Sequence, residues 1–292
     1  MAELEARIAV NCRNVLGEGV TWDPALGRVR WVDIESRELW SLDPQTGAAA
    51  AEKLPERVTC FAPRRAGGLL VGFASGFAIF DPATGRRDDI AAFEPELPHT
   101  RTNDGRTDRQ GRFVCGGFDE VEGKFISSVV RIDGNRRMTT LFGGVACANG
   151  ICFSPDGRTL YFADSPARTM WAFDYDVGSG QISNRRVLTR FEGQPGIPDG
   201  SCVDADGYIW NAQWNGHRIV RYAPDGRVDR IVAVPVLNPS CVAFGGGDLS
   251  TLYITTARYH MSPDQLAAEP DSGALFACVP GVRGLPDAPY CG

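Results

Sequence analysis

Polar and charged side chains recur at one position of a repeated sequence pattern. A turn followed by a short apolar run returns every 39 to 50 residues, and the runs open at Trp22, Phe61, Thr107, Phe153, Val203 and Val242. The residue four places before each opener is polar or charged: Glu18, Arg57, Asn103, Asn149, Asp199 and Asn238. Carboxylate and amide oxygens are the ligands that hard divalent cations prefer. If these positions converge, we expect four side chains to form a cation site: Glu18, Asn103, Asn149 and Asp199.

The repeats themselves are the elements that must position these residues. Six copies at this spacing indicate an all-β protein, a six-bladed β-propeller. Residues 28–33 alternate between polar and apolar side chains, which is typical of a strand. The inner strands of a propeller line its central channel, so equivalent positions of the six blades form a ring there. We therefore expect one metal ion in the central channel, with Arg57 and Asn238 as parts of the channel wall.

The repeat runs from end to end and predicts a single domain over residues 1–292. Residues 7–12 precede the first blade, and we expect them to complete the last blade as an N-terminal strand. No long amphipathic helix is predicted. The connection over residues 90–102 is long, as functional loops often are.

The composition excludes several classes of partner. Thirty-six acidic against thirty basic residues give a net charge of −6, and no run of Lys or Arg could neutralise a row of phosphates, so we expect no nucleic-acid binding. The first ten residues lack the features of a secretory signal, and no segment approaches 18 consecutive apolar residues. We expect a soluble, cytoplasmic monomer that does not bind membranes.

The nine cysteines are an odd number in a chain without an export signal, which argues against a disulfide framework. Paired C-x-x-C spacings, which a thiolate metal site would need, are absent. Four of the nine each stand one residue before an opener: Cys60, Cys152, Cys202 and Cys241. We expect these four to act as small apolar residues packed between adjacent blades.

Position within the repeat separates functional residues from ordinary turns. Pro198-Asp199-Gly200 resembles the turns at residues 155–157 and 224–226, but Asp199 shares the offset of Glu18 and should precede an inner strand. Arg101 lies two residues before Asn103, where it either holds a substrate oxygen or is a solvated loop charge. The sequence has no G-x-S-x-G elbow, so we expect chemistry on a metal-bound substrate or water rather than an acyl-enzyme.

Taken together, these motifs resemble the SMP-30/gluconolactonase/regucalcin-like family of sugar lactonases. The resemblance covers nearly the whole chain, and the order and spacing of its short motifs make it specific. Members of the family commonly have Pro where this chain has Val20, a difference that lies beyond the ligand residue. The motifs are Leu16-Gly17-Glu18-Gly19, Arg101-Thr102-Asn103-Asp104-Gly105, Asn149-Gly150, Pro198-Asp199-Gly200, Trp214-Asn215-Gly216, Phe244-Gly245-Gly246 and Leu252-Tyr253-Ile254-Thr255-Thr256-Ala257.

The resemblance implies a six-bladed propeller with one divalent cation, either Ca, Mg, Mn, Zn or Fe. Its ligands would be Glu18, Asn149 and Asp199, and its substrate contacts Arg101 and Asn103. An acid of the blade-three loop would bind sugar hydroxyls; Asp119 or Glu120 could serve, and we predict Glu120. The implied reaction is hydrolysis of a small-molecule pentono- or hexonolactone to the aldonic acid, with Asp199 as general base for the attacking water.

Two other functions stay open at this point. The first is a non-catalytic calcium-binding or scaffold propeller, whose ion would need saturating protein ligands; three protein ligands leave positions open for substrate and water. The second is a related ester hydrolase on the same fold, for which we would expect a more apolar channel. The polar ring favours a polyol substrate.

Overall fold

A computed structural model describes residues 4–292, which form twenty-five strands and one short helix, α1 (Pro263–Ala268). The strands build six sheets, numbered here as blades 1 to 6. Blade 1 contains β3 (Gly17–Asp23), β4 (Arg28–Asp33), β5 (Glu38–Leu42) and β6 (Ala49–Lys53). Blade 2 contains β7 (Val58–Pro63), β8 (Leu69–Phe73), β9 (Gly76–Asp81) and β10 (Arg86–Ala92). Blade 3 contains β11 (Thr100–Thr107), β12 (Phe113–Asp119), β13 (Ser127–Ile132) and β14 (Met138–Val145).

Blade 4 contains β15 (Ala148–Phe153), β16 (Thr159–Asp164), β17 (Thr169–Tyr175) and β18 (Ile182–Arg190). Blade 5 contains β19 (Ile197–Val203), β20 (Ile209–Trp214), β21 (Arg218–Tyr222) and β22 (Val228–Ala233), with β1 (Leu4–Glu5) parallel to β22 at its edge. Blade 6 contains β23 (Pro239–Gly245), β24 (Thr251–Thr256), β25 (Leu275–Cys278) and β2 (Arg7–Val10). The predicted all-β, six-bladed β-propeller is confirmed.

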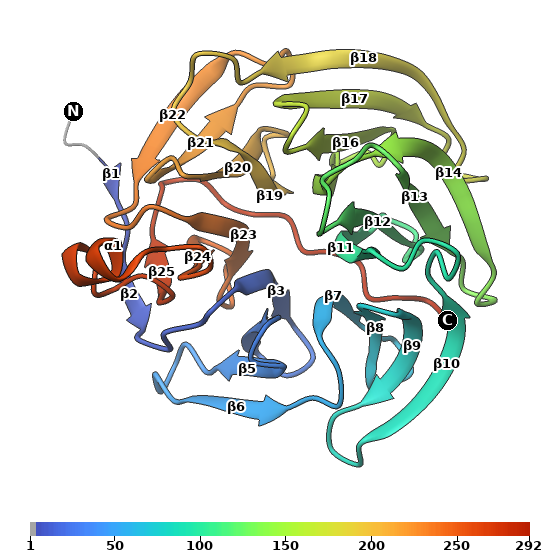
Figure 1. The fold of residues 1–292 in the computed structure, drawn as a ribbon, viewed down its shortest axis with the longest axis horizontal. Coiled ribbons are helices and arrows are strands. Elements are labelled where there is room, and N and C mark those ends of the chain that lie inside the picture. The colour runs from blue at the N-terminus through green and yellow to red at the C-terminus, as the bar shows by residue number, and fades with distance from the viewer. Residues whose placement is uncertain (1–3) are drawn as a thin grey trace. The chain divides into compact units, whose positions relative to one another are not determined.

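The chain forms two compact units. Unit 1 runs to Lys53 and resumes over Phe191–Pro286, so it holds blades 5, 6 and 1. Unit 2 comprises Leu54–Arg190 and Asp287–Gly292, and it holds blades 2, 3 and 4. Within unit 2 the three sheets follow one another along the chain, with β10, β14 and β18 on their outer side (Figure 1). The single domain over residues 1–292 stays a prediction.

The N-terminal segment completes blade 6 as predicted. Strand β2 pairs antiparallel with β25, with Arg7 opposite Ala277 and Ile8 opposite Phe276. The long loop predicted over residues 90–102 is wrong in extent, because β10 ends at Ala92 and β11 begins at Thr100. Both strands pair within their own sheets, which leaves a connection of residues 93–99.

Period-two alternation places the middle strands between two apolar cores. In β12, Phe113 and Cys115 pack with residues of blade 2 such as Cys60, whereas Val114 packs with residues of blade 4 such as Phe153. Successive side chains of a strand point to opposite faces, so one strand serves both cores. The outer strands carry mostly exposed side chains, as β6 does throughout. Burial between neighbouring sheets therefore holds the middle strands in place.

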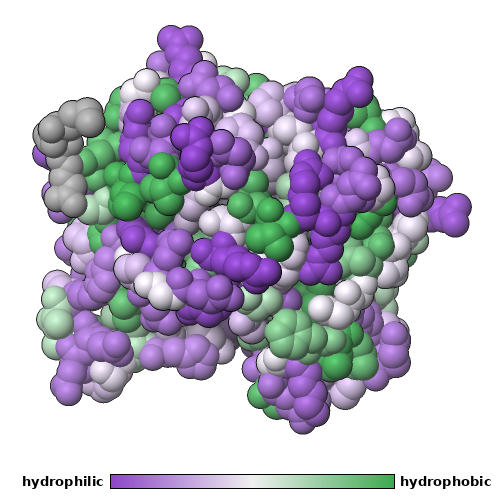
Figure 2. All heavy atoms as spheres, turned by 90° about the horizontal axis from the view of Figure 1, so that it is seen from above, coloured by the Kyte–Doolittle hydropathy of each residue, from purple (hydrophilic) through white to green (hydrophobic). Residues whose placement is uncertain are grey.

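No helix within residues 4–292 is long and apolar enough to cross a membrane; α1 has six residues. On the face drawn in Figure 2, hydrophilic side chains are interspersed with small apolar patches. The nine cysteines, all of them within residues 4–292, form no disulfide bond.

Candidate functional site

Each of the six inner strands carries a β-bulge in the few residues before its opener. In blades 1, 3, 4 and 5, the inner strand has one residue more than the neighbouring strand between two successive pairs. In blade 1, for example, Glu18 pairs with Val32 and Thr21 pairs with Arg30, so two residues of β3 lie opposite one residue of β4. In blades 2 and 6, one residue of the inner strand has no partner between two pairs that are adjacent on the neighbouring strand. A bulge bends the strand and redirects its side chains. All six predicted ring positions lie in these bulged strands or one residue ahead of them.

The bulges correct the prediction that Asp199 precedes its strand. Asp199 lies inside β19, between Pro198, which pairs with Gln213, and Ser201, which pairs with Asn211. Strand pairing continues on both sides of Asp199 because the bulge absorbs the extra residue. Pro198-Asp199-Gly200 is therefore part of a strand and not a turn.

In unit 1 the predicted residues Glu18 and Asp199 lie at the bulges of β3 and β19. Glu18 is half-buried, and its Oε2 accepts a bond of 3.2 Å from the backbone N–H of Gly19, whose φ of +59° suits glycine. Asp199 is 5% exposed, and the Asn211 amide donates to its carbonyl oxygen at 2.7 Å. A Cβ on Gly200 would lie 2.6 Å from the Cys241 sulfur, so blade 5 packs closely on blade 6 at this bulge.

The same packing supports the prediction for the repeated cysteines. In unit 2 the sulfur of Cys60, on blade 2, would lie 3.0 Å from a Cβ on Gly105 of blade 3. The four cysteines of this position are buried, between 0% and 6% exposed. They act as small apolar residues between blades, as Cys60 and Cys241 show directly.

In unit 2 the structure brings Asn103 and Asn149 together. The Asn103 Nδ2 donates to the Ala148 carbonyl at 2.8 Å and to Asn149 Oδ1 at 3.3 Å. The Asn149 Nδ2 donates to the Ser165 hydroxyl oxygen at 2.8 Å. This bond turns the amide so that Oδ1 points away from Ser165. An oriented amide oxygen is a suitable cation ligand.

Arg101 and Glu120 join the same group of side chains. The Arg101 Nε donates to Glu120 Oε2 at 2.8 Å, and its Nη1 donates to Asn103 Oδ1 at 2.6 Å and to the Thr102 carbonyl at 2.9 Å. Arg57 holds both oxygens of Glu120, through Nη1 at 3.0 Å and Nη2 at 2.7 Å. A connected polar network thus runs over blades 2, 3 and 4 through Arg57, Glu120, Arg101, Asn103, Asn149 and Ser165.

The structure excludes one of the two possibilities for Arg101, that of a solvated loop charge. The side chain is 5% exposed and lies in β11, so it is not a solvated loop charge. Its guanidinium carbon lies 5.0 Å from the centroid of the Phe118 ring. Of its three nitrogens, Nη2 alone makes no hydrogen bond to the described part of the chain, residues 4–292. Two N–H donors in a fixed position therefore remain for a ligand.

The structure also distinguishes Asp119 from Glu120. The Asp119 carboxylate accepts bonds from three backbone N–H groups of its own loop: Val121, Glu122 and Lys124. Glu120 instead faces the two guanidinium groups. Burial alone would raise the pKa of Glu120, but the hydrogen bonds and charges of Arg57 and Arg101 outweigh it and lower the pKa. Glu120 is therefore an anion at neutral pH with one acceptor site left on Oε1.

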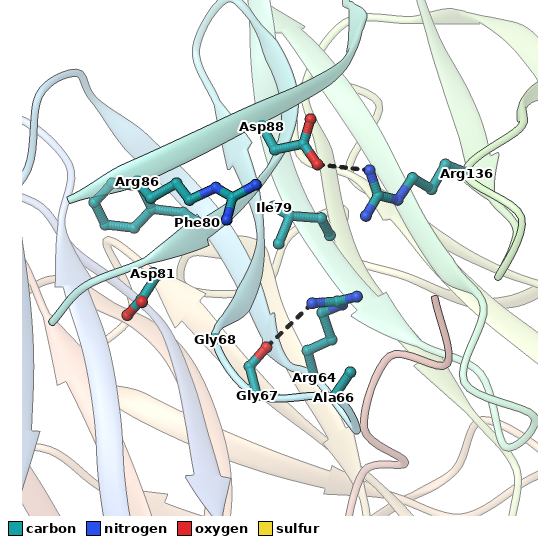
Figure 3. Close-up of a pocket in the computed structure, with 10 residues that line it drawn as sticks. All are labelled: Arg64, Ala66, Gly67, Gly68, Ile79, Phe80, Asp81, Arg86, Asp88 and Arg136. Atoms are coloured by element: carbon teal, nitrogen blue, oxygen red, sulfur yellow. Dashed lines mark hydrogen bonds and ion pairs between the residues drawn. The ribbon is translucent and has the colours of Figure 1, made fainter. Parts of the chain in front are cut away.

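Other hollows of unit 2 lie elsewhere. Figure 3 shows the one of about 380 Å³, where three arginines surround Ile79: Arg64, Arg86 and Arg136. Arg136 is ion-paired at 2.7 Å with Asp88, and both side chains are about half exposed. Exposed pairs of this kind contribute little free energy. No residue of the network lines this hollow or the hollows of about 150 and 420 Å³.

The donor chemistry of the predicted ligands fits a hard cation. Among residues 4–292, no group of three or more His, Cys, Asp and Glu side chains is arranged to hold a metal ion. The predicted ligands include only two acids, Glu18 and Asp199, and their third member is the oriented amide of Asn149. Such an all-oxygen set fits Ca²⁺, Mg²⁺ or Mn²⁺.

Sequence reasoning missed two members of the network. Arg57 was assigned to the channel wall, and no pattern showed that it pairs with a residue 63 positions away. Ser165 follows the end of β16 and has no signal of its own. Only the pairing of the strands places its hydroxyl beside Asn149.

The chain belongs to the SMP-30/gluconolactonase/LRE-like family, whose model matches residues 16–258. It is 41% identical to an L-arabinolactonase of Azospirillum brasilense, covering 99% of this chain and 96% of the relative. It is 37% identical to a 6-deoxy-6-sulfogluconolactonase of Pseudomonas putida, covering 96% of each. Its fold matches a crystal structure of regucalcin from Agrobacterium tumefaciens, described as a calcium-binding protein, with a TM-score of 0.93, 32% identity and 99% of each chain covered.

Proposed function

We propose that this protein is a sugar lactonase, which hydrolyses an aldonolactone to the open aldonic acid. Two relatives at 41% and 37% identity carry lactonase names. The observation that carries the proposal is the polar network of unit 2, which holds Arg101 with Nη2 available and Asn149 with an oriented oxygen. Such groups suit a ligand rich in hydroxyl and carbonyl oxygens.

We propose that Glu18, Asn149 and Asp199 hold one divalent cation. Their common position four residues before the opener, next to or within a bulge, and their all-oxygen donor set support this assignment, and Ser165 keeps the Asn149 amide turned for it. When bound, the cation would supply a Lewis acid for the lactone carbonyl oxygen. Calcium, magnesium and manganese suit these ligands best, and zinc and iron(II) also accept them.

The side chains of the chain would then perform separate tasks. Arg101 would donate through Nη2 to substrate oxygens, and Asn103 would accept a sugar hydroxyl with the remaining lone pair of Oδ1. Glu120 would accept another hydroxyl at Oε1. These contacts would orient the lactone ring before reaction. Asp199 would take the proton of the attacking water as general base.

The substrate we propose is a pentono- or hexonolactone, in line with the polar character of the network. The test is an assay of the purified protein against a panel of both ring types, with and without a chelator. We expect hydrolysis of at least one lactone, lost on chelation and restored by a divalent cation. Failure to hydrolyse any lactone would refute the proposal.

One alternative has an observation of its own. The matched regucalcin structure is described as a calcium-binding protein, which favours a non-catalytic calcium-binding propeller as the second candidate. The same assay separates the two, because that protein would bind calcium and hydrolyse no lactone.

Three further properties stay proposals from the sequence: a single domain, a monomer and a cytoplasmic location. The repeat common to blades 1 to 6 supports the single domain. One cooperative unfolding transition followed by two probes, and a mass near 31.6 kDa by light scattering, would test the first two. Two separate transitions would contradict the single domain.

A further inference from the structure

Arg57 reaches from blade 2 to an acid of blade 3. It precedes β7 by one residue, at the ring position of its blade, and its side chain is 30% exposed. Both terminal nitrogens contact the Glu120 carboxylate, at 3.0 and 2.7 Å. A two-pronged contact of this kind fixes the plane of a carboxylate as well as its distance.

Glu120 passes this constraint to Arg101. Its Oε2 accepts from the Arg101 Nε at 2.8 Å, next to the bond that it accepts from Arg57. Because Nε is bound on one side and Nη1 on the other, the guanidinium plane of Arg101 is determined. The orientation of Nη2 therefore depends on the position of Glu120.

We propose that Arg57 is a positioning residue for the lactonase reaction, a role that rests on the function proposed above. It acts through Glu120, keeping that carboxylate ionised and aligned so that Arg101 presents Nη2 to the substrate. Arg57 itself need not touch the substrate. Without Arg57, Glu120 keeps a single bond to Arg101 and is free to rotate or to become protonated.

The charges around Glu120 predict a change in pH dependence. The guanidinium groups that face it are Arg57 and Arg101, while the Asp119 carboxylate on its own loop is bound to backbone N–H groups. Removing Arg57 leaves one of the two guanidinium groups. Glu120 will then bind a proton at a higher pH than in the wild type.

Blade 2 offers a matched control one residue away. Glu56 pairs with Arg87 at 2.8 Å, and each of these side chains is 29% exposed, close to the 30% and 26% of Arg57 and Glu120. Arg87 also contacts Asp89 and the Phe73 ring, but no residue of the network. Arg87→Ala therefore removes an arginine–glutamate pair of the same kind without changing Arg101.

The experiment compares Arg57→Ala, Arg57→Lys and Arg87→Ala by kcat/KM on the best lactone from pH 3.5 to 8, together with thermal melts. We expect Arg57→Ala to lose roughly tenfold in kcat/KM and its acid limb to move to higher pH. Arg57→Lys should restore part of the rate, since a lysine keeps the charge but lacks the planar fork. Arg87→Ala should keep the wild-type rate and profile.

Combining Arg57→Ala with Glu120→Gln tests whether Arg57 acts through Glu120. In Glu120→Gln no carboxylate remains to titrate, so adding Arg57→Ala should no longer move the acid limb. An acid limb that still moves in the double variant would overturn the proposal, as would a wild-type rate and profile in Arg57→Ala. An inactive wild-type protein would instead refute the lactonase function, and with it this role of Arg57.

If Arg57→Ala does not fold, Arg57→Lys and Arg57→Gln carry the test. A second measurement needs no turnover: the difference in unfolding free energy between wild type and the Arg57 variant should shrink as the pH falls. Glu120 becomes protonated at low pH and no longer attracts Arg57. A difference that stays constant from pH 7 to pH 3.5 would contradict the pairing.

Discussion

The two ends of the inner strand β11 use the same residue types for opposite purposes. Asp108, which follows the strand, is fully buried and accepts four hydrogen bonds. The donors are the backbone N–H groups of Gln110 and Arg112 at 2.9 Å, the Arg112 Nε at 2.5 Å and the Tyr175 hydroxyl at 2.8 Å. Every acceptor site of this carboxylate is therefore used within the fold.

The bulged end of β11 is different. Arg101 keeps Nη2 available, Glu120 keeps one acceptor site, and its side chain is 26% exposed. These groups are held by one another more than by the local backbone. An acid and an arginine are structural where local N–H groups saturate them, and are available for a ligand where they do not.

Blade 5 contains a second saturated acid, Asp204, which follows the inner strand β19. Asp204 is fully buried and accepts from the Trp210 Nε1 at 2.9 Å, from the Arg221 side chain at 2.8 and 2.7 Å and from two backbone N–H groups. Asp108 and Asp204 occupy the same position of the repeat, one residue after the opener, and the fold saturates both carboxylates. The structural end of blade 3 therefore has a counterpart in blade 5.

The largest effect is expected at the bulged end. Asp199→Asn should lower kcat about 10²- to 10⁴-fold, because an amide cannot take a proton from water. Metal affinity should fall far less, because the amide still offers an oxygen. Calorimetry with Mn²⁺ and steady-state kinetics measure both, and equal losses would leave Asp199 a ligand only. Unfolding free energy should change little.

At Asp108, which follows β11, we expect the opposite: a large loss of stability and no loss of rate. Asp108→Asn leaves the buried Arg112 without its counter-charge and should cost about 3–5 kcal/mol of unfolding free energy. The rate per folded molecule should stay at the wild-type value. Urea unfolding beside kinetics on the folded fraction measures the two, and a loss below about 1 kcal/mol would contradict the contrast.

Arg101→Ala should lose about 1.5–3 kcal/mol of transition-state stabilisation, which is roughly 10- to 150-fold in kcat/KM. Some stability should be lost too, since the side chain is buried and makes three hydrogen bonds. Arg101→Lys should restore only part of the rate, because an ammonium lacks the planar fork. A wild-type kcat/KM in Arg101→Ala would remove the substrate role.

A smaller effect is expected at Ser165. Ser165→Ala removes the acceptor that orients Asn149 and should weaken Mn²⁺ binding about tenfold. Ser154→Ala is the matched control in blade 4: its hydroxyl bonds Asp156 and the Thr159 N–H, so it should lower stability and leave metal affinity unchanged. Equal metal affinity in wild type and Ser165→Ala would contradict the orienting role.

The smallest effect concerns pH. The pKa of Glu120 is lowered in the folded protein, so its contribution to stability is present above the pKa of the unfolded chain and is lost as the pH falls through the folded value. Because Glu120 is partly exposed, we expect this contribution to stay within about 1 kcal/mol. Wild type should lose more stability than Glu120→Gln between pH 6 and pH 3, by urea unfolding. If the unfolding free energies of wild type and Glu120→Gln fall in parallel with pH, Glu120 makes no such contribution.

The sequence alone determined the features that repeat. Apolar alternation and turn residues act over a few positions, so six copies of one pattern predict six sheets without knowledge of their contacts. The common offset of Glu18 and Asp199 was visible for the same reason. The strand-completing role of residues 7–12 also followed, because an N-terminal strand often completes the last blade of a propeller.

Only the tertiary structure decided which polar side chains have all their hydrogen bonds made within the protein. Asp119 and Glu120 are adjacent acids in the sequence, yet one binds three N–H groups of its own loop and the other binds Arg57 from another blade. The bulge that keeps Asp199 inside β19 depends on its pairing with β20. Hydrogen bonds between side chains from separate strands depend on distances across the sheets, and a local pattern contains no record of those distances.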